Sequence, residues 1–354
     1  GFALMKTLRK LIAALLVCCM ALPLAACGEV QATEKQLFAM NSAVSIKAYG
    51  KNAEAGLNSA ASVISALDAS LDPEREGSTL YNINSAAGDG IVITGQVAEM
   101  LQTARTVYDA TGGALDLTVY PLVKAWGFID GLYNVPSESE IDSLLEHVDF
   151  SAVNVSAMTE TDTYLLTMPA GMELTFAAVA RGCAAMYAMR AMRQAGVESG
   201  IVSFGGTVMT LGVKPDGSDW VVGLQDPVNT GSYAATLNVG ADTAVVTSGG
   251  YLRYFVDDDG NYRQHILDPA TGYPAESDLL SVTVICDDGT YADALSTALY
   301  VMGERDAKSF YEDNTGFELV LITNDNRVVV SEGVREDFTL SGSDYTVETL
   351  RRPS

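Results

Sequence analysis

The most constraining feature of the sequence is the stretch from residue 245 to residue 303, which contains three distinct patterns. They are VVTSGGYLRYF (245–255), HILDPATGYP (265–274) and YADALSTALYVMG (291–303). The first pattern is a β-branched run that ends at the glycine pair Gly249–Gly250, as expected where a strand turns. The second places His265 and Asp268 beside a Pro–Gly turn, and the third has the apolar spacing of a helix. A strand, a polar turn and a helix are therefore expected in this order.

Two oxygen-bearing side chains lie on one face of the expected helix at 291–303. Asp293 and Thr297 are four residues apart, which places them one turn apart on the same face. A carboxylate and a hydroxyl are hard ligands that suit Mg²⁺, which takes few protein ligands together with water and substrate phosphates. The alternative is a buried helix that carries a polar notch and no metal. The helix by itself does not distinguish these two interpretations.

Composition excludes several classes of protein. Of the 354 residues, 48% are hydrophobic and 19% are charged, which is typical of a globular chain and not of a disordered one. The formal net charge of −24 argues against nucleic-acid binding, because that function needs a basic surface. The sequence has no internal repeat and no clear interdomain linker, and its predicted strands and helices do not alternate regularly. It therefore predicts one main α+β domain, at residues 37–354.

The first residues have the pattern of an export signal. Lys6, Arg9 and Lys10 form a positive segment, and LIAALLVCCMAL (11–22) is apolar but too short for a comfortable membrane span. Small residues then lead directly to Cys27, in a Leu-Ala-Ala-Cys pattern that resembles a bacterial lipobox.

We interpret residues 1–26 as a lipoprotein signal peptide that is removed when Cys27 is acylated. Residues 27–36 are then a polar tether between the lipid and the domain. The protein is accordingly expected to be extracytoplasmic and anchored to the bacterial cell membrane. The alternative is an ordinary signal peptide that is cut near Ala26.

Cysteine usage agrees with export. Of the five cysteines, two lie in the expected signal and Cys27 is the expected lipidation site. Only Cys183 and Cys286 remain, each in an apolar stretch that is typical of a small buried side chain. The sequence does not decide whether these two form a disulfide.

Hydrophobic periodicity and turn residues predict the remaining elements. Helices are expected at residues 52–70, 94–110, 137–148, 179–196 and 304–313. Strands are expected at 37–50, 163–168, 200–212 and 219–227, in a hairpin at 317–331, and once more within 332–354. Residues 71–84 are expected to form a polar loop. Gly205 and Gly206 interrupt the strand at 200–212, which indicates either a bulge or a close approach of the backbone to a ligand.

Several separated motifs together resemble the FAD:protein FMN transferases, the ApbE flavin-transferase family. Besides the three patterns at 245–303, the chain has Ala39-Met40-Asn41-Ser42 where members typically have Ala-Met-Gly-Thr. The family's Gly-Gly-Ala-Phe-Asp-Pro-Thr corresponds to Gly112-Gly113-Ala114-Leu115-Asp116-Leu117-Thr118, and its Gly-Gly-Asn to Gly205-Gly206-Thr207. The resemblance covers residues 37–330 and implies a single ApbE-like domain, related to the T-fold.

The resemblance implies a Mg²⁺-dependent transfer of FMN from FAD to a Thr or Ser hydroxyl of an extracytoplasmic target protein, with release of AMP. FAD is then a substrate, Mg²⁺ is the cofactor, and the partner is an acceptor flavoprotein of extracytoplasmic electron transfer. Two alternatives stand beside it. One is an FAD pyrophosphatase that releases FMN and AMP, and the other is a non-catalytic flavin-binding lipoprotein.

Carried over residue by residue, the resemblance implies three sets of site residues. The metal ligands are the side chains of Asp293 and Thr297 and the backbone carbonyl of Ala178. The FAD-contacting positions are Met40, Ala114, Leu115, Asp116, Thr175, Arg181 and Leu267. His265 is implied as the residue that activates the acceptor hydroxyl, a role that suits a neutral imidazole near pH 7.

The flavin-contacting motif departs from the family pattern. The usual Asp-Leu-Gly-Gly-Ile-Ala-Lys-Gly is here TFAAVARG (175–182), so an acid has become Thr175 and a lysine has become Arg181. Asn41 and Met186 also replace a usual Gly and a usual Asp. The expected metal residues are intact while the flavin end is altered. We therefore expect weaker FAD binding than in typical members, with a weakened or retargeted activity.

Overall fold

The computed structural model describes residues 30–86, 88–159, 162–342 and 344–353. The fold below is that of the compact unit Ala32–Ser354. The predicted signal peptide and Cys27 lie outside the described residues. Within the described ranges, no helix combines the length and the apolar character needed to cross a membrane.

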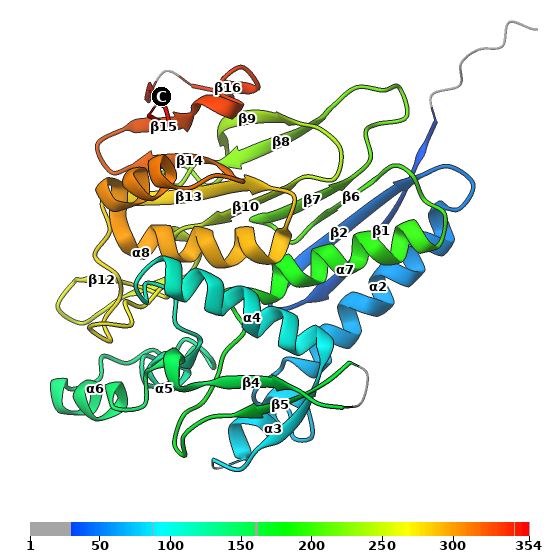
Figure 1. The fold of residues 1–354 in the computed structure, drawn as a ribbon. Coiled ribbons are helices and arrows are strands. Elements are labelled where there is room, and N and C mark those ends of the chain that lie inside the picture. The colour runs from blue at the N-terminus through cyan, green and yellow to red at the C-terminus, as the bar shows by residue number, and fades with distance from the viewer. Residues whose placement is uncertain (1–29, 87, 160–161, 343, 354) are drawn as a thin grey trace, which may run out of the picture. The chain divides into compact units, whose positions relative to one another are not determined.

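The centre of the fold is a sheet of nine strands in the described residues (Figure 1). In spatial order they are β1 (Ala32–Ala39), β2 (Ser42–Tyr49), β6 (Gly200–Ser203), β7 (Thr207–Leu211), β10 (Ala244–Ser248), β13 (Leu279–Cys286), β14 (Glu318–Thr323), β15 (Arg327–Ser331) and β17 (Thr346–Leu350). Neighbouring strands pair antiparallel except β15 and β17, which are parallel. The antiparallel pairing brings the start of β2, the β6–β7 turn and the end of β10 to the same end of the sheet.

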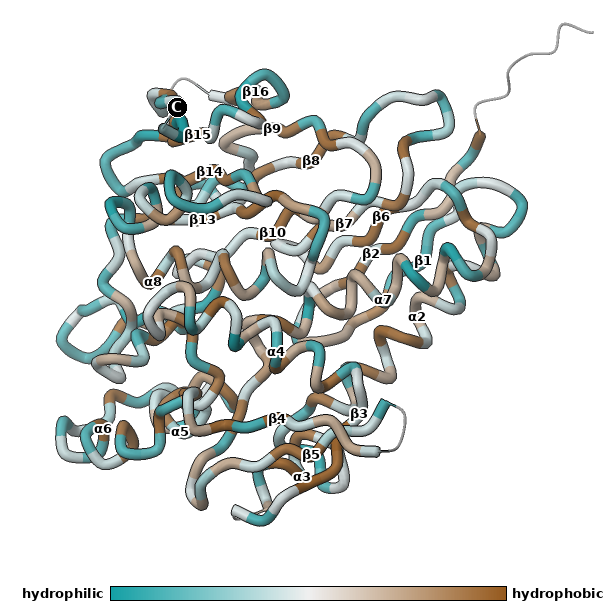
Figure 2. The backbone as a smooth tube through the Cα atoms, in the orientation of Figure 1, coloured by the Kyte–Doolittle hydropathy of each residue, from teal (hydrophilic) through white to brown (hydrophobic). Residues whose placement is uncertain are grey.

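Three helices pack against one face of this sheet (Figure 1). They are α2 (Ala53–Ser70), α7 (Ala180–Gln194) and α8 (Gly289–Asp313), with α7 in contact with both α2 and α8. A fourth, α4 (Gly95–Ala110), packs on α8. Hydrophobic and hydrophilic residues alternate along α2 and α4, as expected for helices with one buried face (Figure 2). Gly303 interrupts α8 with a φ of 80°, so the predicted helices at 291–303 and 304–313 are two parts of one bent element.

The opposite face of the central sheet is covered by a smaller sheet. Its strands are β8 (Trp220–Gln225), β9 (Tyr233–Val239) and β16 (Phe338–Leu340). Alternate residues of the central strands take part in its core, including Val245, Ile285 and Val320. Because layers cover both faces, β13 and β14 are apolar almost throughout, which explains their lack of polar alternation.

Shorter elements complete the fold below the helices in Figure 1. A three-stranded sheet combines β3 (Ile91–Thr94), β5 (Thr163–Thr167) and β4 (Asn154–Ala157), and three short helices are α3 (Thr79–Ser85), α5 (Tyr120–Ala125) and α6 (Glu138–Leu145). The hairpin of β11 (Tyr254–Val256) and β12 (Tyr262–Gln264) leads into the HILDP turn.

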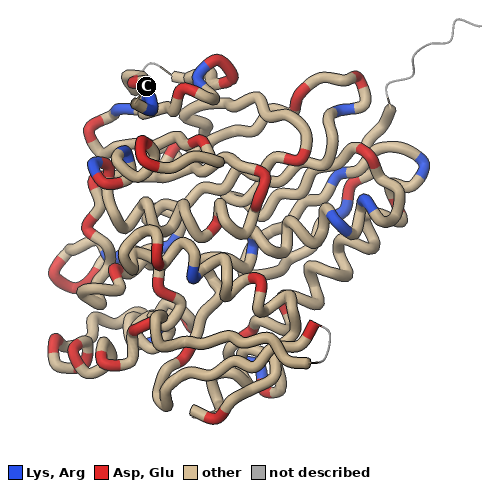
Figure 3. The backbone as a smooth tube through the Cα atoms, viewed as in Figure 1, with Lys and Arg blue, Asp and Glu red and all other residues tan. Residues whose placement is uncertain are grey.

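Asp and Glu are distributed over all parts of this fold, and Lys and Arg are fewer (Figure 3).

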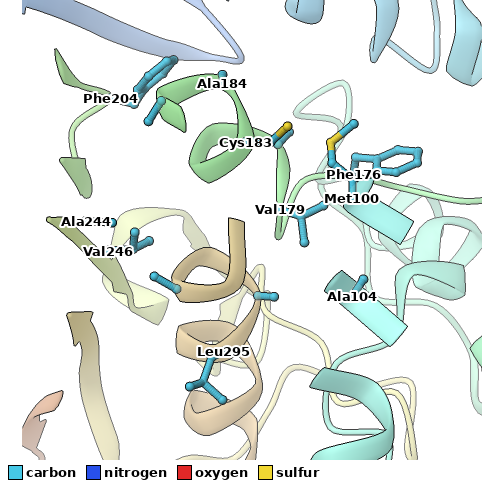
Figure 4. Close-up of a cluster of buried hydrophobic side chains, with 14 of the residues drawn as sticks. Met100, Ala104, Phe176, Val179, Cys183, Ala184, Phe204, Ala244, Val246 and Leu295 are labelled. Carbon is cyan, nitrogen blue, oxygen red and sulfur yellow. The ribbon is translucent and has the colours of Figure 1, made fainter. Parts of the chain in front are cut away.

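The main hydrophobic core lies between the central sheet and its helices (Figure 4). Met100 of α4, Cys183 of α7, Leu295 of α8 and Val246 of β10 are all buried there. Close packing of α7 on α8 depends on glycine, because a Cβ added to Gly182 would lie only 1.9 Å from the carbonyl oxygen of Gly289. Cys183 and Cys286 are both free thiols, which answers the question that the sequence left open.

The predicted α+β class is confirmed, and several predicted boundaries are wrong. Residues 32–36, expected in the tether, belong to β1, where their backbone pairs with β2. The single strand expected at 37–50 is two strands, because Met40 and Asn41 turn the chain with φ of 52° and 55°.

Other differences arise from short elements. The loop expected at 71–84 ends in α3, whose first turn is capped by Ser78, and 332–354 holds two strands instead of one. The interruption at Gly205–Gly206 is a hairpin turn between β6 and β7, closed by the bond from the Phe204 amide to the Thr207 carbonyl at 2.8 Å.

Candidate active site

The predicted metal residues lie where α7 begins beside α8. The amide of Gly182 donates a hydrogen bond to Oδ2 of Asp293 at 2.8 Å, and only 2% of the Asp293 surface is exposed. Burial raises the pKa of the Asp293 carboxyl, and the charge of Arg181 and the amides of Gly182 and Arg181 oppose that rise. The carboxylate is therefore held in place by the start of α7 and needs a cation to offset the cost of its burial.

A cluster of hydroxyl oxygens lies one turn further along α8. The Thr297 hydroxyl lies 3.4 Å from the Asp293 carbonyl oxygen and 3.2 Å from Oγ of Ser248, which also lies 2.8 Å from Oγ of Ser296. The carbonyl of Ala178, one turn before Gly182, accepts no hydrogen bond within the described part of the chain. Carboxylate, hydroxyl and carbonyl oxygens are a donor set that fits Mg²⁺.

This arrangement differs from a multi-carboxylate centre. Among the described residues, no group of three or more His, Cys, Asp or Glu side chains could hold a metal ion. A site built on Asp293 has one acidic ligand, so a bound Mg²⁺ would keep most of its positive charge for a phosphate ligand.

His265 follows β12 and is fixed by the backbone of Arg253. Its own amide and its ring Nδ1 both lie 3.1 Å from the Arg253 carbonyl oxygen. A carbonyl oxygen only accepts, so Nδ1 carries the proton and Nε2 keeps its lone pair. Burial first, and then the positive charge of Arg253, lower the pKa of His265 to about 3. The imidazole is therefore a neutral base with Nε2 available.

The HILDP turn is anchored to a separate small core. Leu267 forms an isolated antiparallel bridge with Pro274, and its side chain packs with Trp126 and Phe128 in a third hydrophobic cluster. The Trp126 indole N–H donates to the Gly272 carbonyl at 2.9 Å, which holds the turn against α5. The backbone of Leu267 is thus rigid and two residues away from His265.

The flavin-contacting residues predicted at 114–116 and 175 lie side by side. The amide of Thr175 donates to the Leu117 carbonyl at 2.9 Å. Both oxygens of Asp116 are used internally, since Oδ1 accepts from the Thr118 amide at 2.7 Å and Oδ2 from the Phe150 amide at 3.0 Å. The Asp116 carboxylate is therefore structural, and contact of this segment with FAD stays a prediction.

Thr175 has a local role that the sequence did not indicate. Its hydroxyl accepts a hydrogen bond from the Ala177 amide at 3.3 Å, which stabilises the turn before α7. An aspartate at this position could make the same bond with one oxygen and leave the other free. The substitution therefore removes a charge without removing the turn.

Met40 lies in the turn between β1 and β2, at the end of the sheet that also holds Ser248. Its amide donates to Oδ1 of Asp68 at 2.7 Å, which fixes the left-handed turn. Gly205 lies against Ser42 in the neighbouring turn. Met40 makes no hydrogen bond to His265 or Asp293 within the described ranges, so its place in a shared pocket stays a prediction.

Arg181 lies near both the predicted metal ligand Asp293 and the proposed base His265. Its charge acts on the Asp293 carboxyl and on the His265 imidazole, so these groups share one electrostatic environment. The structure thus brings Arg181, His265 and Asp293, which lie far apart in the sequence, into one site.

Three polar residues of this site were missed by the sequence analysis. Ser248 and Ser296 form the hydroxyl cluster beside Thr297, and Arg253 holds His265. Ser248 and Arg253 belong to TSGGYLRYF, where an arginine in a run with no other charged residue was the available signal.

Comparison with known proteins identifies the family. The sequence model described as the ApbE family matches residues 40–321. This chain belongs to the ApbE family. The family predicted from the sequence motifs is therefore confirmed.

Individual ApbE relatives are similar to this chain over most of their length. A protein of Klebsiella pneumoniae named FAD:protein FMN transferase is 30% identical over 279 residues, which are 78% of this chain and 85% of the relative. One of the same name from Treponema pallidum is 29% identical over 289 residues, 78% of this chain and 80% of the relative. The crystal structure of the ApbE protein of Thermotoga maritima superimposes with a TM-score of 0.79 at 29% identity, and covers 87% of this chain and 99% of its own.

Proposed function

We propose that this protein transfers FMN from FAD to a Thr or Ser hydroxyl of an acceptor protein and releases AMP, with Mg²⁺ as cofactor. The observation that carries the proposal is the neutral His265, whose Nε2 is free because Nδ1–H is bound to the Arg253 carbonyl. It lies in the same electrostatic environment as the oxygen ligands at Asp293. A base beside a site for a phosphate-bound cation is what a phosphoryl transfer to a hydroxyl requires.

The proposed step balances without a further reactant. His265 Nε2 accepts the proton of the acceptor hydroxyl, and the oxygen forms a bond to the phosphorus of the FMN half. The bond from that phosphorus to the bridging oxygen of the diphosphate breaks, and AMP leaves with the electron pair. Nδ1–H stays bound to the Arg253 carbonyl, which stabilises the imidazolium that forms.

Asp293, Thr297 and the Ala178 carbonyl are the residues that would hold the cation. When bound there, Mg²⁺ supplies positive charge that offsets the charge developing on the diphosphate. The chain's own contribution is to keep the Asp293 carboxylate oriented through the Gly182 amide and to keep the Thr297 hydroxyl beside Ser248.

We further propose that the enzyme acts outside the cytoplasm on a flavoprotein of extracytoplasmic electron transfer. The support is the lipobox-like pattern that ends at Cys27 and the apolar segment before it. The test is fractionation of cells that express the wild type or Cys27→Ala. Wild-type protein in the membrane fraction and variant protein outside it are expected, and wild-type protein free of lipid would refute the anchor.

One assay separates transfer from its alternatives. Purified protein is incubated with FAD, Mg²⁺ and a library of peptides that share one fixed Thr, and covalent flavin fluorescence and AMP are measured. Flavin-labelled peptide with equimolar AMP is expected. AMP with free FMN and no labelled peptide would indicate a pyrophosphatase, and FAD binding without AMP would indicate a non-catalytic flavin-binding protein.

A further inference from the structure

Two arginines of the site have no acidic partner at ion-pair distance. Arg181 and Arg253 take part in none of the ion pairs within the described ranges. The chain has 45 acidic and only 21 basic residues, so unpaired arginines in a partly buried site are not explained by a shortage of acids (Figure 3). Nε of Arg181 is buried without any hydrogen-bond partner in the part of the chain that the structure describes.

The two guanidinium groups are close enough to affect each other. Burial and then the like charge of Arg181 lower the pKa of Arg253, and both arginines lower that of His265. Like charges that share a partly buried site repel, and the acidic group that interacts with Arg181 here is Asp293. The site therefore has an excess of positive charge that an anionic ligand would neutralise.

Arg253 is also oriented by its contacts. Its Nη1–H donates to the Phe128 carbonyl at 3.1 Å, and its own carbonyl accepts from His265. The other guanidinium N–H groups of Arg253 have no hydrogen-bond partner among the described residues. A guanidinium that is fixed at one nitrogen and free at the others presents a planar set of donors, which matches the geometry of phosphate oxygens.

We infer that Arg253 is a second cationic residue that binds the diphosphate of FAD together with Arg181, and that it stabilises the phosphate of the departing AMP. The inference rests on the proposed function. A diphosphate fits better than a single carboxylate, because it has two anionic groups and can neutralise two guanidinium charges at once. As the bond to the bridging oxygen breaks, the AMP phosphate gains negative charge, and the free N–H groups of Arg253 are available to it.

The position of Arg253 gives it two separate effects on the reaction. Its carbonyl sets the tautomer of His265, and its side chain faces the charge of the leaving group. Substitution of the side chain keeps the backbone carbonyl, so the base remains oriented while the proposed phosphate contact is lost. This difference allows the diphosphate contact to be tested by itself.

The test measures binding of three ligands by titration calorimetry without Mg²⁺, so that no turnover occurs. FAD and ADP contain the diphosphate, and riboflavin contains only the flavin. Arg253→Met should weaken FAD and ADP roughly 10–100-fold, the loss expected for one or two charge-assisted hydrogen bonds, and leave riboflavin unchanged. The matched control is Arg193→Met, which removes an exposed arginine paired with Asp242 and should change none of the three affinities.

Each other outcome has a definite meaning. Unchanged FAD and ADP affinities in Arg253→Met, or an equal loss for riboflavin, overturn the inference. If thermal melting shows that Arg253→Met does not fold, Arg253→Lys keeps the charge and the stem and should still weaken ADP several-fold, because it lacks the planar set of donors. Wild-type protein that binds ADP but never transfers FMN refutes the proposed function alone, and wild-type protein that binds neither FAD nor ADP refutes both.

Discussion

The amide nitrogen of Gly182 lies 2.8 Å from Oδ2 of Asp293, and this bond joins the start of α7 to the first part of α8. In a regular helix the same amide would bond to the carbonyl of Ala178. That carbonyl instead accepts no hydrogen bond in the described ranges. One hydrogen bond therefore both orients the proposed metal carboxylate and leaves a second oxygen ligand free.

Asp293→Asn tests this arrangement without removing the acceptor of the Gly182 amide. Asn keeps the size and one carbonyl oxygen but loses the charge, so the fold should persist while Mg²⁺-dependent release of AMP falls to background. Asp293→Ala should in addition lose about 1–3 kcal/mol of unfolding free energy, because it leaves the buried amide without a partner. Urea unfolding and AMP release are measured on both variants.

A matched control exists on the same helix. Asp288 caps α8 by accepting from the Tyr291 amide at 3.0 Å. Asp288→Ala should lose about 1 kcal/mol of stability and keep its Mg²⁺-dependent activity. If Asp293→Asn retains full Mg²⁺-dependent turnover, the metal assignment is wrong.

Gly182→Ala should destabilise the protein through the contact between α7 and α8. An added Cβ would lie 1.9 Å from the Gly289 carbonyl oxygen and 2.8 Å from Cβ of Asp293, so the helices must separate. Overpacking of this kind costs about 1–3 kcal/mol or more, and Mg²⁺ affinity should fall with it. Gly231→Ala is the control, because its Cβ would meet only the Asn229 side chain at 3.7 Å, and its melting temperature should match the wild type.

The regular elements of this chain were largely predictable from its sequence. The apolar spacing of α2, α4 and α7 and the β-branched runs of β10 and β14 are strong local signals, and the helix expected from residue 137 is capped by Ser137. Boundaries failed where one or two residues decide the path. The left-handed Met40 and Asn41 split one apparent strand in two, although neither residue type by itself requires that conformation.

The site was predictable only where a motif carried it. His265, Asp293 and Thr297 came from motifs, and their shared surroundings came from the packing of α7, α8 and β12, which local patterns do not encode. The structural use of the Asp116 carboxylate depends on the Phe150 amide, 34 positions further along the chain. Arg253 was overlooked because its role follows from a backbone carbonyl and from the absence of an acidic partner, and neither is visible in a sequence.

Thr175→Asp should tighten the binding of FAD. An Asp can keep the bond to the Ala177 amide and place a second oxygen toward the flavin, as the resemblance to the family implies for this position. The expected gain is roughly 10-fold, in the range of one hydrogen bond to a charged group. Flavin fluorescence titration of Thr175→Asp and of Thr175→Asn measures it, and equal affinities in both variants would show that charge at this position has no role.

His265→Ala should separate binding from transfer. The diphosphate and metal residues remain, so FAD should bind as before, while transfer to a hydroxyl should fall roughly 10²–10⁴-fold, the usual contribution of a general base. His147→Ala, which removes the other histidine of the chain near the end of α6, is the control and should transfer FMN normally. Unchanged transfer in His265→Ala would leave this imidazole with a structural role only.

The pH dependence of stability tests the state of His265 independently of activity. Its pKa in the folded protein is about 3, below the ordinary value of 6.5, so between these values the unfolded chain binds a proton that the folded chain does not. The stability due to His265 is therefore complete above pH 6.5 and declines as the pH falls toward 3. His265→Asn keeps a side-chain N–H for the Arg253 carbonyl and cannot titrate. Between pH 7.5 and 5, urea unfolding should show a larger loss of stability in the wild type than in this variant, and equal losses would mean that His265 is protonated normally.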